Sequence, residues 1–314
     1  MARADDLIDR RSLRRKVSFW RVVAALAVVA AVAVASLLTF DGETGGEEIA
    51  RVSIEGMITE DHKLLDLLDR LKEDEAVRAV VLRIDSPGGT TVGGEALYEA
   101  VRSLAETKPV ATEVGTLAAS AGYMVAAASD HIVARRTSIV GSIGVLFQYV
   151  NASKLLDTVG VEVDSVKSSP IKAEPSPFGP PPPEALQMID SLIMDTYDWF
   201  RDIVRERRQM TAAEIAAVDN AAIFSGRQAI DLKLVDAIGG EEAVRQWLEE
   251  EREIPAGLEI VDRKPDSEDG LPFALLEAGS RSLAEALGFD AGILPWSVKA
   301  MQLDGLVSLW HPSR

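Results

Sequence analysis

Residues 110–124 read VATEVGTLAASAGYM, and this stretch decides the fold class. Its first five residues have the apolar, β-branched character of a buried strand, whereas small residues crowd both sides of Ser120. The pattern predicts a strand, a tight turn and a helix that begins just after Ser120. Ser120 is therefore a candidate nucleophile, and the alternative is a serine that only caps the helix.

Short strand-like runs alternate with helical periodicity on both sides of this stretch, which predicts an α/β layered domain. Strands are expected at residues 50–54, 79–84, 110–114, 132–134, 145–150, 161–166 and 258–261. Helices are expected at residues 64–71, 97–104, 151–160 and 184–208, and capping boxes at Thr211 and Ser225 open two more. In the helix between Asn151 as N-cap and Gly160, the stripe Leu155, Leu156 and Val159 is expected to pack in the core.

Residues 168–183 break this rhythm because they contain seven prolines, four of them consecutive at positions 180–183. Proline lacks a backbone N–H and fixes φ, so neither a helix nor an inner strand can form there. The segment is expected to be an extended arm.

The run 22–40 is uncharged and just long enough to cross a bilayer as one helix. Six basic residues lie between positions 10 and 21, and acidic residues follow position 40, so the N-terminus is expected in the cytoplasm. A cleaved signal peptide ending near Ala33-Val34-Ala35 is the alternative. In both cases the body is extracytoplasmic, which in a bacterial cell means an inner-membrane protein with a periplasmic catalytic domain.

Five regions follow from these patterns. They are a basic cytoplasmic segment (1–21), a transmembrane anchor (22–40), a linker (41–48), a catalytic domain (49–254) and a C-terminal extension (255–314). The extension carries an apolar segment that could pack on a neighbour, touch the membrane or shield the site.

Composition narrows the function further. The 314-residue chain has a formal net charge of −17, which argues against a nucleic-acid partner because phosphate binding needs clustered Lys and Arg. It has no cysteine, so it has no disulfide and no thiolate nucleophile. No His-Glu-x-x-His motif is present, and neither a metal nor a cofactor is expected.

A serine nucleophile needs a base. The three histidines, His62, His131 and His311, lie in contexts that suit surface turns or chain ends, so a Ser-His-Asp triad is disfavoured. A lysine whose pKa is lowered by burial can take the same role. The glycine pair in Asp85-Ser86-Pro87-Gly88-Gly89 follows a predicted strand and can leave a backbone N–H bare for an oxyanion.

Four segments, in order, resemble motifs of the SppA-type signal peptide peptidases. They are DSPGG at residues 85–89, TLAASAGYM at 116–124, GSIG at 141–144 and SSPIKAEP at 168–175, and the similarity runs from about Ile49 to Gly240. The resemblance implies a Clp-protease/crotonase-like fold of repeated strand-strand-helix units. It also implies a serine protease with an N-terminal anchor, homo-oligomeric rings and remnant signal peptides as substrates.

Carried over residue by residue, the resemblance makes Ser120 the nucleophile and Lys172 the general base, held by a hydrogen bond from Ser142. The N–H groups of Gly89 and Ala121 would form the oxyanion hole. Ala121 stands where relatives often have glycine, and its methyl group leaves the N–H available. Lys167 is the rival base, outside the matched SPIKAEP segment. Tyr123 and Met124 could line a substrate pocket, although core packing suits them better.

Three other functions are compatible with parts of the sequence. The first is a Clp-like membrane protease associated with stomatin-type proteins, which differs mainly in substrate. The second is a membrane-tethered scaffold without activity, which would be expected to have lost Ser120 or Lys172. The third is a crotonase-like acyl-CoA enzyme, which would not explain an exported chain.

Overall fold

The computed structural model describes residues 46–265 and 307–309, together with Trp20, Val23 and Leu26. The chain divides into two units, Met1–Gly46 and Glu47–Arg314, and the description below concerns the second. Among the described residues, no helix is long and apolar enough to cross a membrane. Apart from Val23 and Leu26, the expected anchor at 22–40 lies outside those residues.

The second unit alternates strands and helices, as the periodicity predicts. In chain order the elements are β1 (Glu48–Ile58), α2 (His62–Glu73), β2 (Val77–Thr90), α3 (Thr91–Ala105), β3 (Val110–Ala119), α4 (Ala121–Ala128), β4 (His131–Ala134), β5 (Ile139–Gly141), α5 (Ser153–Val159), α6 (Pro183–Arg207), α7 (Ala212–Ala216), β6 (Ile223–Ser225), α8 (Gly226–Asp231), β7 (Ala237–Ile238), α9 (Glu241–Glu251), β8 (Glu259–Asp262) and β9 (Val307–Leu309). The α/β fold class is confirmed.

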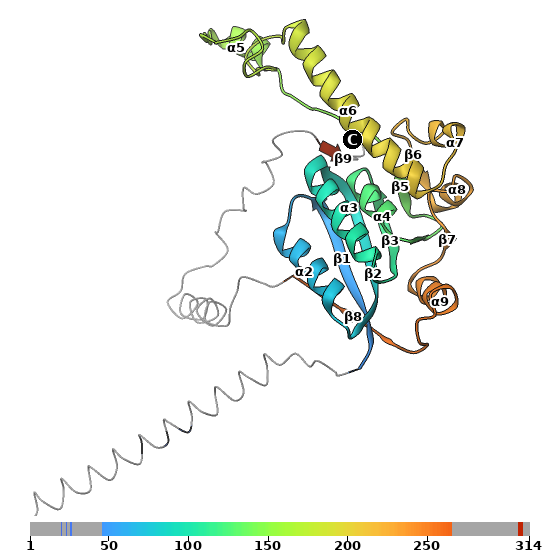
Figure 1. Ribbon diagram of the computed structural model, residues 1–314. Helices are drawn as coiled ribbons and strands as arrows, with labels where there is room; N and C mark the ends of the chain where they lie inside the picture. Colours follow the sequence, from blue (N-terminus) through green and yellow to red (C-terminus); the bar gives the residue numbers. More distant parts are fainter. Residues whose placement is uncertain (1–19, 21–22, 24–25, 27–45, 266–306, 310–314) are drawn as a thin grey trace, which may run out of the picture. The chain divides into compact units, whose positions relative to one another are not determined.

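One mostly parallel sheet organises these elements (Figure 1). Its main path runs β6-β5-β3-β2-β1-β8, with β4 beside β3, β7 beside β4 and β9 beside β2. The pairs β5–β6 and β2–β9 are antiparallel, and the other pairs are parallel. The chain therefore crosses over through helices between neighbouring parallel strands, which is the α/β pattern.

Both faces of the central strands are buried. On β2, Val80, Leu82 and Ile84 face the larger core under α2, α3 and α4, whereas Ala79 and Val81 face a smaller core under α9. Alternate residues of a strand point to opposite faces, so a strand covered on both sides has to be apolar almost throughout. That is why residues 79–84 could be predicted as a strand.

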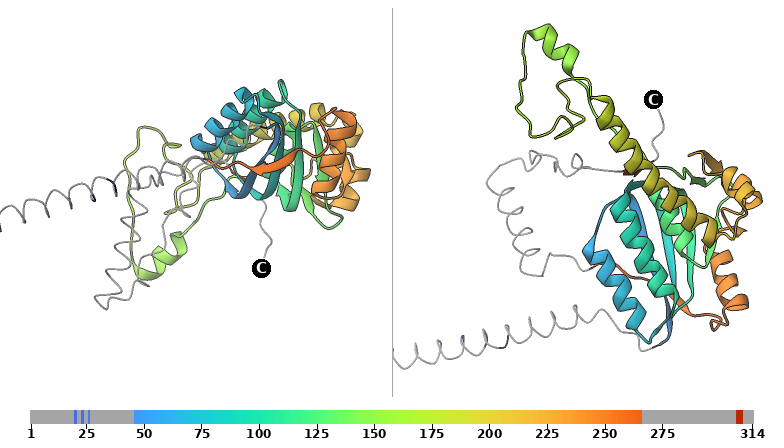
Figure 2. Two further views of the ribbon diagram at one scale, coloured as in Figure 1. Left: turned by 90° about the horizontal axis from the view of Figure 1, so that it is seen from below. Right: turned by 45° about the horizontal axis from the view of Figure 1, so that its top comes forward.

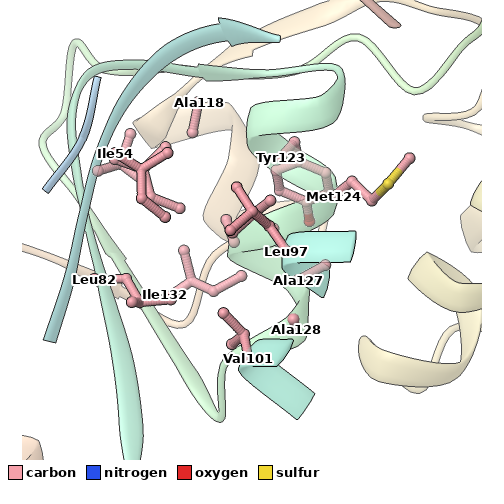
Figure 3. Close-up of a cluster of buried hydrophobic side chains, with 14 of the residues drawn as sticks. Ile54, Leu82, Leu97, Val101, Ala118, Tyr123, Met124, Ala127, Ala128 and Ile132 are labelled. Carbon is pink, nitrogen blue, oxygen red and sulfur yellow. The ribbon is translucent and has the colours of Figure 1, made fainter. Parts of the chain in front are cut away.

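Helix α4 lies in the middle of the larger core. All eight of its residues are buried, and Figure 3 shows Tyr123 and Met124 of this helix in one cluster with Leu97 of α3 and with Ile54 and Leu82 of the sheet. The Tyr123 O–H donates to the Leu234 carbonyl at 2.8 Å, and burial raises the pKa of the phenol. These two residues are core residues and do not line a pocket.

Other local expectations are confirmed as well. The long helix is α6, and both capping boxes form, with Thr211 bonded to Glu214 and Ser225 bonded to Gln228. Gly160 ends α5 in the left-handed conformation, with φ at 71°. The N-cap of α5 is Ala152 rather than Asn151, although the Asn151 side chain accepts a bond from the Ser153 N–H at 3.0 Å.

Two expected strands, 145–150 and 161–166, are wrong. After Gly141 the chain leaves the regular strands of the sheet: residues 161–166 form no strand or bridge, and within 145–150 only Leu146 forms an isolated bridge. The core packing expected for Leu155, Leu156 and Val159 on α5 is wrong as well. Helix α5 has no buried residue, and Leu155 is 65% exposed.

The region from residue 145 to α6 instead forms an arm. Figures 1 and 2 both show α5 and its flanking loops at the end of α6 that points away from the sheet. Helix α6 is anchored near its other end, where Phe200 and Val204 join the larger core. The proline-rich segment 168–182 contains no helix or strand, as expected, but it is a series of turns and bends rather than an extended chain, and Pro183 already begins α6.

Strand β2 continues past the point at which the sequence predicts a turn. It runs to Thr90, so the Asp85–Gly89 motif lies within the strand, and Gly88 and Gly89 pair with Met57 and Ile58 of β1. The register shifts between Glu55 and Met57. A Cβ atom on Gly89 would lie 1.8 Å from the Ile58 carbonyl oxygen, so only glycine fits there.

We expect Gly89→Ala to lower the free energy of unfolding by about 1–3 kcal/mol, because the new methyl group would meet backbone that cannot move aside. The matched control is Gly179→Ala in the arm, where a Cβ would have no neighbour within 4 Å. Urea denaturation of the two purified variants measures the difference. Equal midpoints for both variants and the parent chain would contradict the close fit between β1 and β2.

Candidate active site

Ser120 lies in a strained turn between β3 and α4. Its φ is 56° and its ψ is −123°, a backbone conformation that a side chain other than glycine rarely adopts. The turn is held because the Ser120 N–H donates to the Gly141 carbonyl at 2.8 Å and the Met124 N–H donates to the Ser120 carbonyl at 2.9 Å. The side chain is thereby presented at the junction of strand and helix, as in a nucleophile elbow.

Ser120 occupies the N-cap position of α4, but its hydroxyl makes no capping bond to the helix. The alternative of a serine that only caps the helix is therefore wrong. Ser120 also lies at the positive end of the dipole of this eight-residue helix, which favours negative charge that develops nearby. A reaction that forms an oxyanion next to Ser120 would gain from this position.

The Asp85–Gly89 motif packs directly against the start of α4. Ser86 pairs with Ala118 of β3, and a Cβ atom on Gly122 would lie 2.9 Å from the Ser86 carbonyl oxygen. On the other side of Gly89, a Cβ on Gly94 would lie 3.0 Å from the Cβ of Ala121. Gly89 therefore lies between two residues that contact the first turn of α4, which brings the first two motifs together.

Ser86 is a positioning residue that the sequence reasoning missed. The Gly88 N–H donates to its Oγ at 3.1 Å, which fixes the backbone just before Gly89. A serine two residues before a glycine, next to proline, is a local signal for such a side-chain turn and could have identified it.

The Gly141–Gly144 motif joins the site through its backbone. The carbonyl of Gly141 accepts the bond from Ser120, and the Ser142 N–H donates to the Ala222 carbonyl at 2.7 Å. Ser142 is buried and has a φ of 54°. Ser142 follows the residue that is bonded to Ser120, which suits its predicted role of holding the lysine. The structure records no bond between Ser142 and Lys172.

Lys172, the predicted base, lies on the arm. Its side chain is exposed and forms no hydrogen bond or ion pair with the described residues, while its N–H donates to the Ser169 carbonyl at 3.0 Å. From Pro183 to the buried Phe200, helix α6 advances by seventeen residue steps, or about 25 Å at about 1.5 Å each. One chain alone therefore assembles three of the four motifs around Ser120 and leaves the fourth on the arm.

The rival Lys167 already has a partner on the arm. Its Nζ lies 2.5 Å from Oε1 of Glu174, whose other oxygen accepts a bond from the Ser176 N–H at 2.8 Å. The Lys167 ammonium, followed by the Ser176 N–H, lowers the pKa of Glu174. This ion pair closes the loop that contains Lys172, so Lys167 has a structural role.

The described histidines have structural surroundings as well. The His131 ring stacks on Trp247 with 4.7 Å between ring centroids, and burial lowers the pKa of His131. His62 is the first residue of α2. Both lie on elements other than β3 and α4, which flank the Ser120 turn, and His311 lies outside the described residues.

Comparisons with known proteins agree with this arrangement. Residues 102–255 match peptidase family S49, and residues 49–148 match the Clp protease family. A protein of Methanocaldococcus jannaschii that is named as a protease is 34% identical over 242 residues, which cover 72% of this chain and 78% of that protein.

Two further relatives carry more specific names. A protein of Enterococcus faecium named as signal peptide peptidase SppA is 30% identical over 246 residues, which cover 73% of this chain and 70% of that protein. Protease 4 of Haemophilus influenzae is 30% identical over 210 residues, which cover 63% of this chain and 34% of that protein. Together with the Ser120 turn and the motifs packed around it, these similarities show that the chain is a serine protease and belongs to peptidase family S49, the SppA-type peptidases.

Proposed function

We propose that this protein is a membrane-anchored endopeptidase that degrades remnant signal peptides or other apolar peptides through a Ser120–Lys172 dyad. The observation that carries the proposal is the strained Ser120 turn at the N-terminus of α4, with the Gly89 strand packed beside it. The turn supplies a nucleophile, and its surroundings supply backbone donors for an oxyanion.

In the proposed reaction the neutral Lys172 amine takes the proton of the Ser120 hydroxyl while Oγ attacks the scissile carbonyl. The N–H groups of Gly89 and Ala121 stabilise the oxyanion of the tetrahedral intermediate. The lysine then gives its proton to the leaving amine, which leaves an acyl-enzyme on Ser120. Water activated by the same amine attacks the ester and releases the second product.

The proposed location rests on the sequence before the catalytic domain. An apolar run from 22 to 40, basic residues before it and acidic residues after it support a single N-terminal anchor with the catalytic domain outside the cytoplasm. Signal peptides are left in the membrane after cleavage, so an anchored protease would meet apolar substrates where they arise.

We further propose that each working site is completed by two subunits of a ring. Lys172 is exposed in the single chain, whereas a lysine that acts as a base needs apolar surroundings. The arm around it exposes many large apolar side chains, although the chain as a whole is strongly acidic. These side chains are Leu146, Tyr149, Val150, Leu155, Val159, Val161, Val163, Val166, Ile171, Phe178, Leu186, Met188, Leu192 and Met194.

An apolar surface of this extent is typical of a contact with another protein. A neighbouring subunit that covers the arm would bury Lys172 and place it beside that subunit's own Ser120. Because the arm of one chain would meet the Ser120 turn of the next, the interface would be heterologous, and a heterologous interface forms a ring when its rotation closes.

Ser120→Ala is expected to abolish cleavage of a fluorogenic apolar peptide, because the substitution removes the nucleophile. The fold should be unchanged, since alanine already occupies positions 118, 119 and 121. Circular dichroism and peptide cleavage are measured on the same preparation, and labelling by a fluorophosphonate should be lost in parallel. Retained cleavage by the folded variant would show that another residue is the nucleophile.

The two lysines of the arm can be separated by making the same substitution at each. Lys172→Arg should lower kcat on the order of 10²–10⁴-fold, because guanidinium stays protonated and cannot act as a base. Lys167→Arg keeps a cation opposite Glu174 and should retain near-normal turnover. The opposite result, an active Lys172→Arg and an inactive Lys167→Arg, would move the base to Lys167.

Co-expression tests the shared site. Ser120→Ala and Lys172→Ala chains are each expected to be inactive alone. In a randomly mixed ring about a quarter of neighbouring pairs unite an intact Ser120 with an intact Lys172, so activity should partly return. Mixed rings can be verified by two different affinity tags, and verified mixed rings with no recovery would place both residues in one chain.

A further inference from the structure

Three arginines from three helices gather around one carboxylate at the C-terminal end of α4. They are Arg102 of α3, Arg207 of α6 and Arg252 at the C-cap of α9. Their guanidinium nitrogens lie 3.7, 3.8 and 3.8 Å from carboxylate oxygens of Asp130. Helix α4 has eight residues, so its length of about 12 Å separates this arginine cluster from the Ser120 turn.

The arginines are held in place without using all of their donors. None of them donates a hydrogen bond to Asp130, because the distances exceed the range of a hydrogen bond. Arg207 instead donates to two carbonyls at the end of α4, at 3.2 and 3.1 Å, and Arg102 donates to a third at 2.8 Å. A guanidinium has five N–H groups, so both keep donors that no described residue accepts.

Positive charge exceeds negative charge at this place, although the whole chain has a net charge of −17. Two further cations nearby are neutralised, Arg208 by Asp236 at 2.5 Å and Lys233 by Glu214 at 2.7 Å. Asp130 alone faces the three arginines of the cluster, and no other carboxylate of the described residues lies within 4 Å of their nitrogens. Two positive charges are therefore left without a carboxylate.

The cluster borders an open hollow of about 490 Å³. Its wall includes the cations Arg207, Arg208 and Lys233 and the carboxylates Asp130 and Asp236. A volume of this size is ordinary for a small-ligand site. Burial, followed by the charge of a neighbouring arginine, lowers the pKa of Arg207, so the cation lies where a bound anion would stabilise it.

We infer that this hollow binds a phosphate group, either inorganic phosphate or the headgroup of an anionic lipid. Phosphate oxygens would accept the remaining guanidinium N–H groups and offset the excess charge, and the planar fork of arginine suits phosphate geometry. The site goes beyond the proposed function, because it lies at the end of α4 opposite Ser120. A bound phosphate would reduce the repulsion among the arginines that hold this end of the helix.

The test is a titration of the full-length chain in nonionic detergent with potassium phosphate. Potassium chloride keeps the ionic strength constant, so that general screening does not contribute. Isothermal titration calorimetry should show saturable binding. Tm should rise with phosphate concentration, because the ligand binds the folded chain and has no such cluster to bind in the unfolded one.

Asp130→Asn assigns the binding to this hollow. The variant removes the carboxylate that competes with phosphate, and its amide oxygen can still accept the bond that the Val110 N–H donates at 3.2 Å. One unit charge about 4 Å away changes an affinity roughly tenfold, so we expect Kd to fall by that factor. Arg207→Gln should raise Kd by a similar factor. The matched control is Arg78→Gln, because Arg78 is paired singly with Glu47 at 3.1 Å and should not affect Kd.

Arg207 also holds the end of α4, so a third variant keeps the test decisive if Arg207→Gln does not fold. Lys233→Gln changes a half-exposed side chain on the wall of the hollow and should raise Kd several-fold. An unchanged Kd in both Asp130→Asn and Lys233→Gln would place the bound phosphate elsewhere and overturn the inference.

Phosphatidylglycerol, added to the same detergent micelles in place of phosphate, distinguishes the two sources. A rise in Tm with the lipid, enlarged by Asp130→Asn, would identify a headgroup site. A rise with potassium phosphate alone, enlarged in the same way, would identify a site for the free ion. No rise with either ligand would overturn the inference. Peptide cleavage is not measured, so failure of the Ser120–Lys172 dyad would leave this result unaffected.

Discussion

The hydrogen bond from the Ser120 N–H to the Gly141 carbonyl is the contact on which the site depends. It holds Ser120 at a positive φ, and its acceptor, Gly141, is itself fixed by neighbouring backbone. Gly141 has a φ of 106°, and a Cβ there would lie 2.9 Å from the Ala222 carbonyl oxygen. The Ser142 N–H bonds to that same carbonyl. Three segments far apart in sequence therefore fix one turn, and its strain persists because β5 and β6 are paired.

Such contacts between distant segments explain which parts of the fold could be predicted from the sequence and which could not. Strands 79–84 and 110–114 were predictable because a strand buried on both faces is mostly apolar, although 110–114 also contains the buried Thr112 and Glu113. The segments 145–150 and 161–166 have a similar composition, yet they are not strands. Many of their apolar side chains are exposed on the arm, and only Leu146 forms an isolated bridge. The composition of a segment predicts that its apolar side chains are buried, but it does not predict which neighbouring segment buries them.

The candidate site also has a part that could be predicted from the sequence and a part that could not. The motifs around Ser120 are held by local strand-to-helix turns and by glycines that only a close backbone approach explains, so their positions follow from the sequence. The place of Lys172 does not follow, because it depends on how far α6 carries the arm from its anchor at Phe200. The Lys167–Glu174 ion pair could not be predicted either. The two residues lie seven positions apart in a proline-rich loop, and such a loop has no periodicity from which to infer a contact.

Backbone geometry at the end of β2 also limits how selective the protease can be. Beyond the Ser86–Ala118 pair, the edge of β2 that β3 leaves presents main-chain N–H and C=O groups, and these discriminate poorly between side chains. Under the proposed function, such main-chain groups would accept any extended apolar segment that reaches them. Under the proposed function, selectivity would therefore come from access, through the proposed membrane anchor and the proposed subunit that completes the dyad.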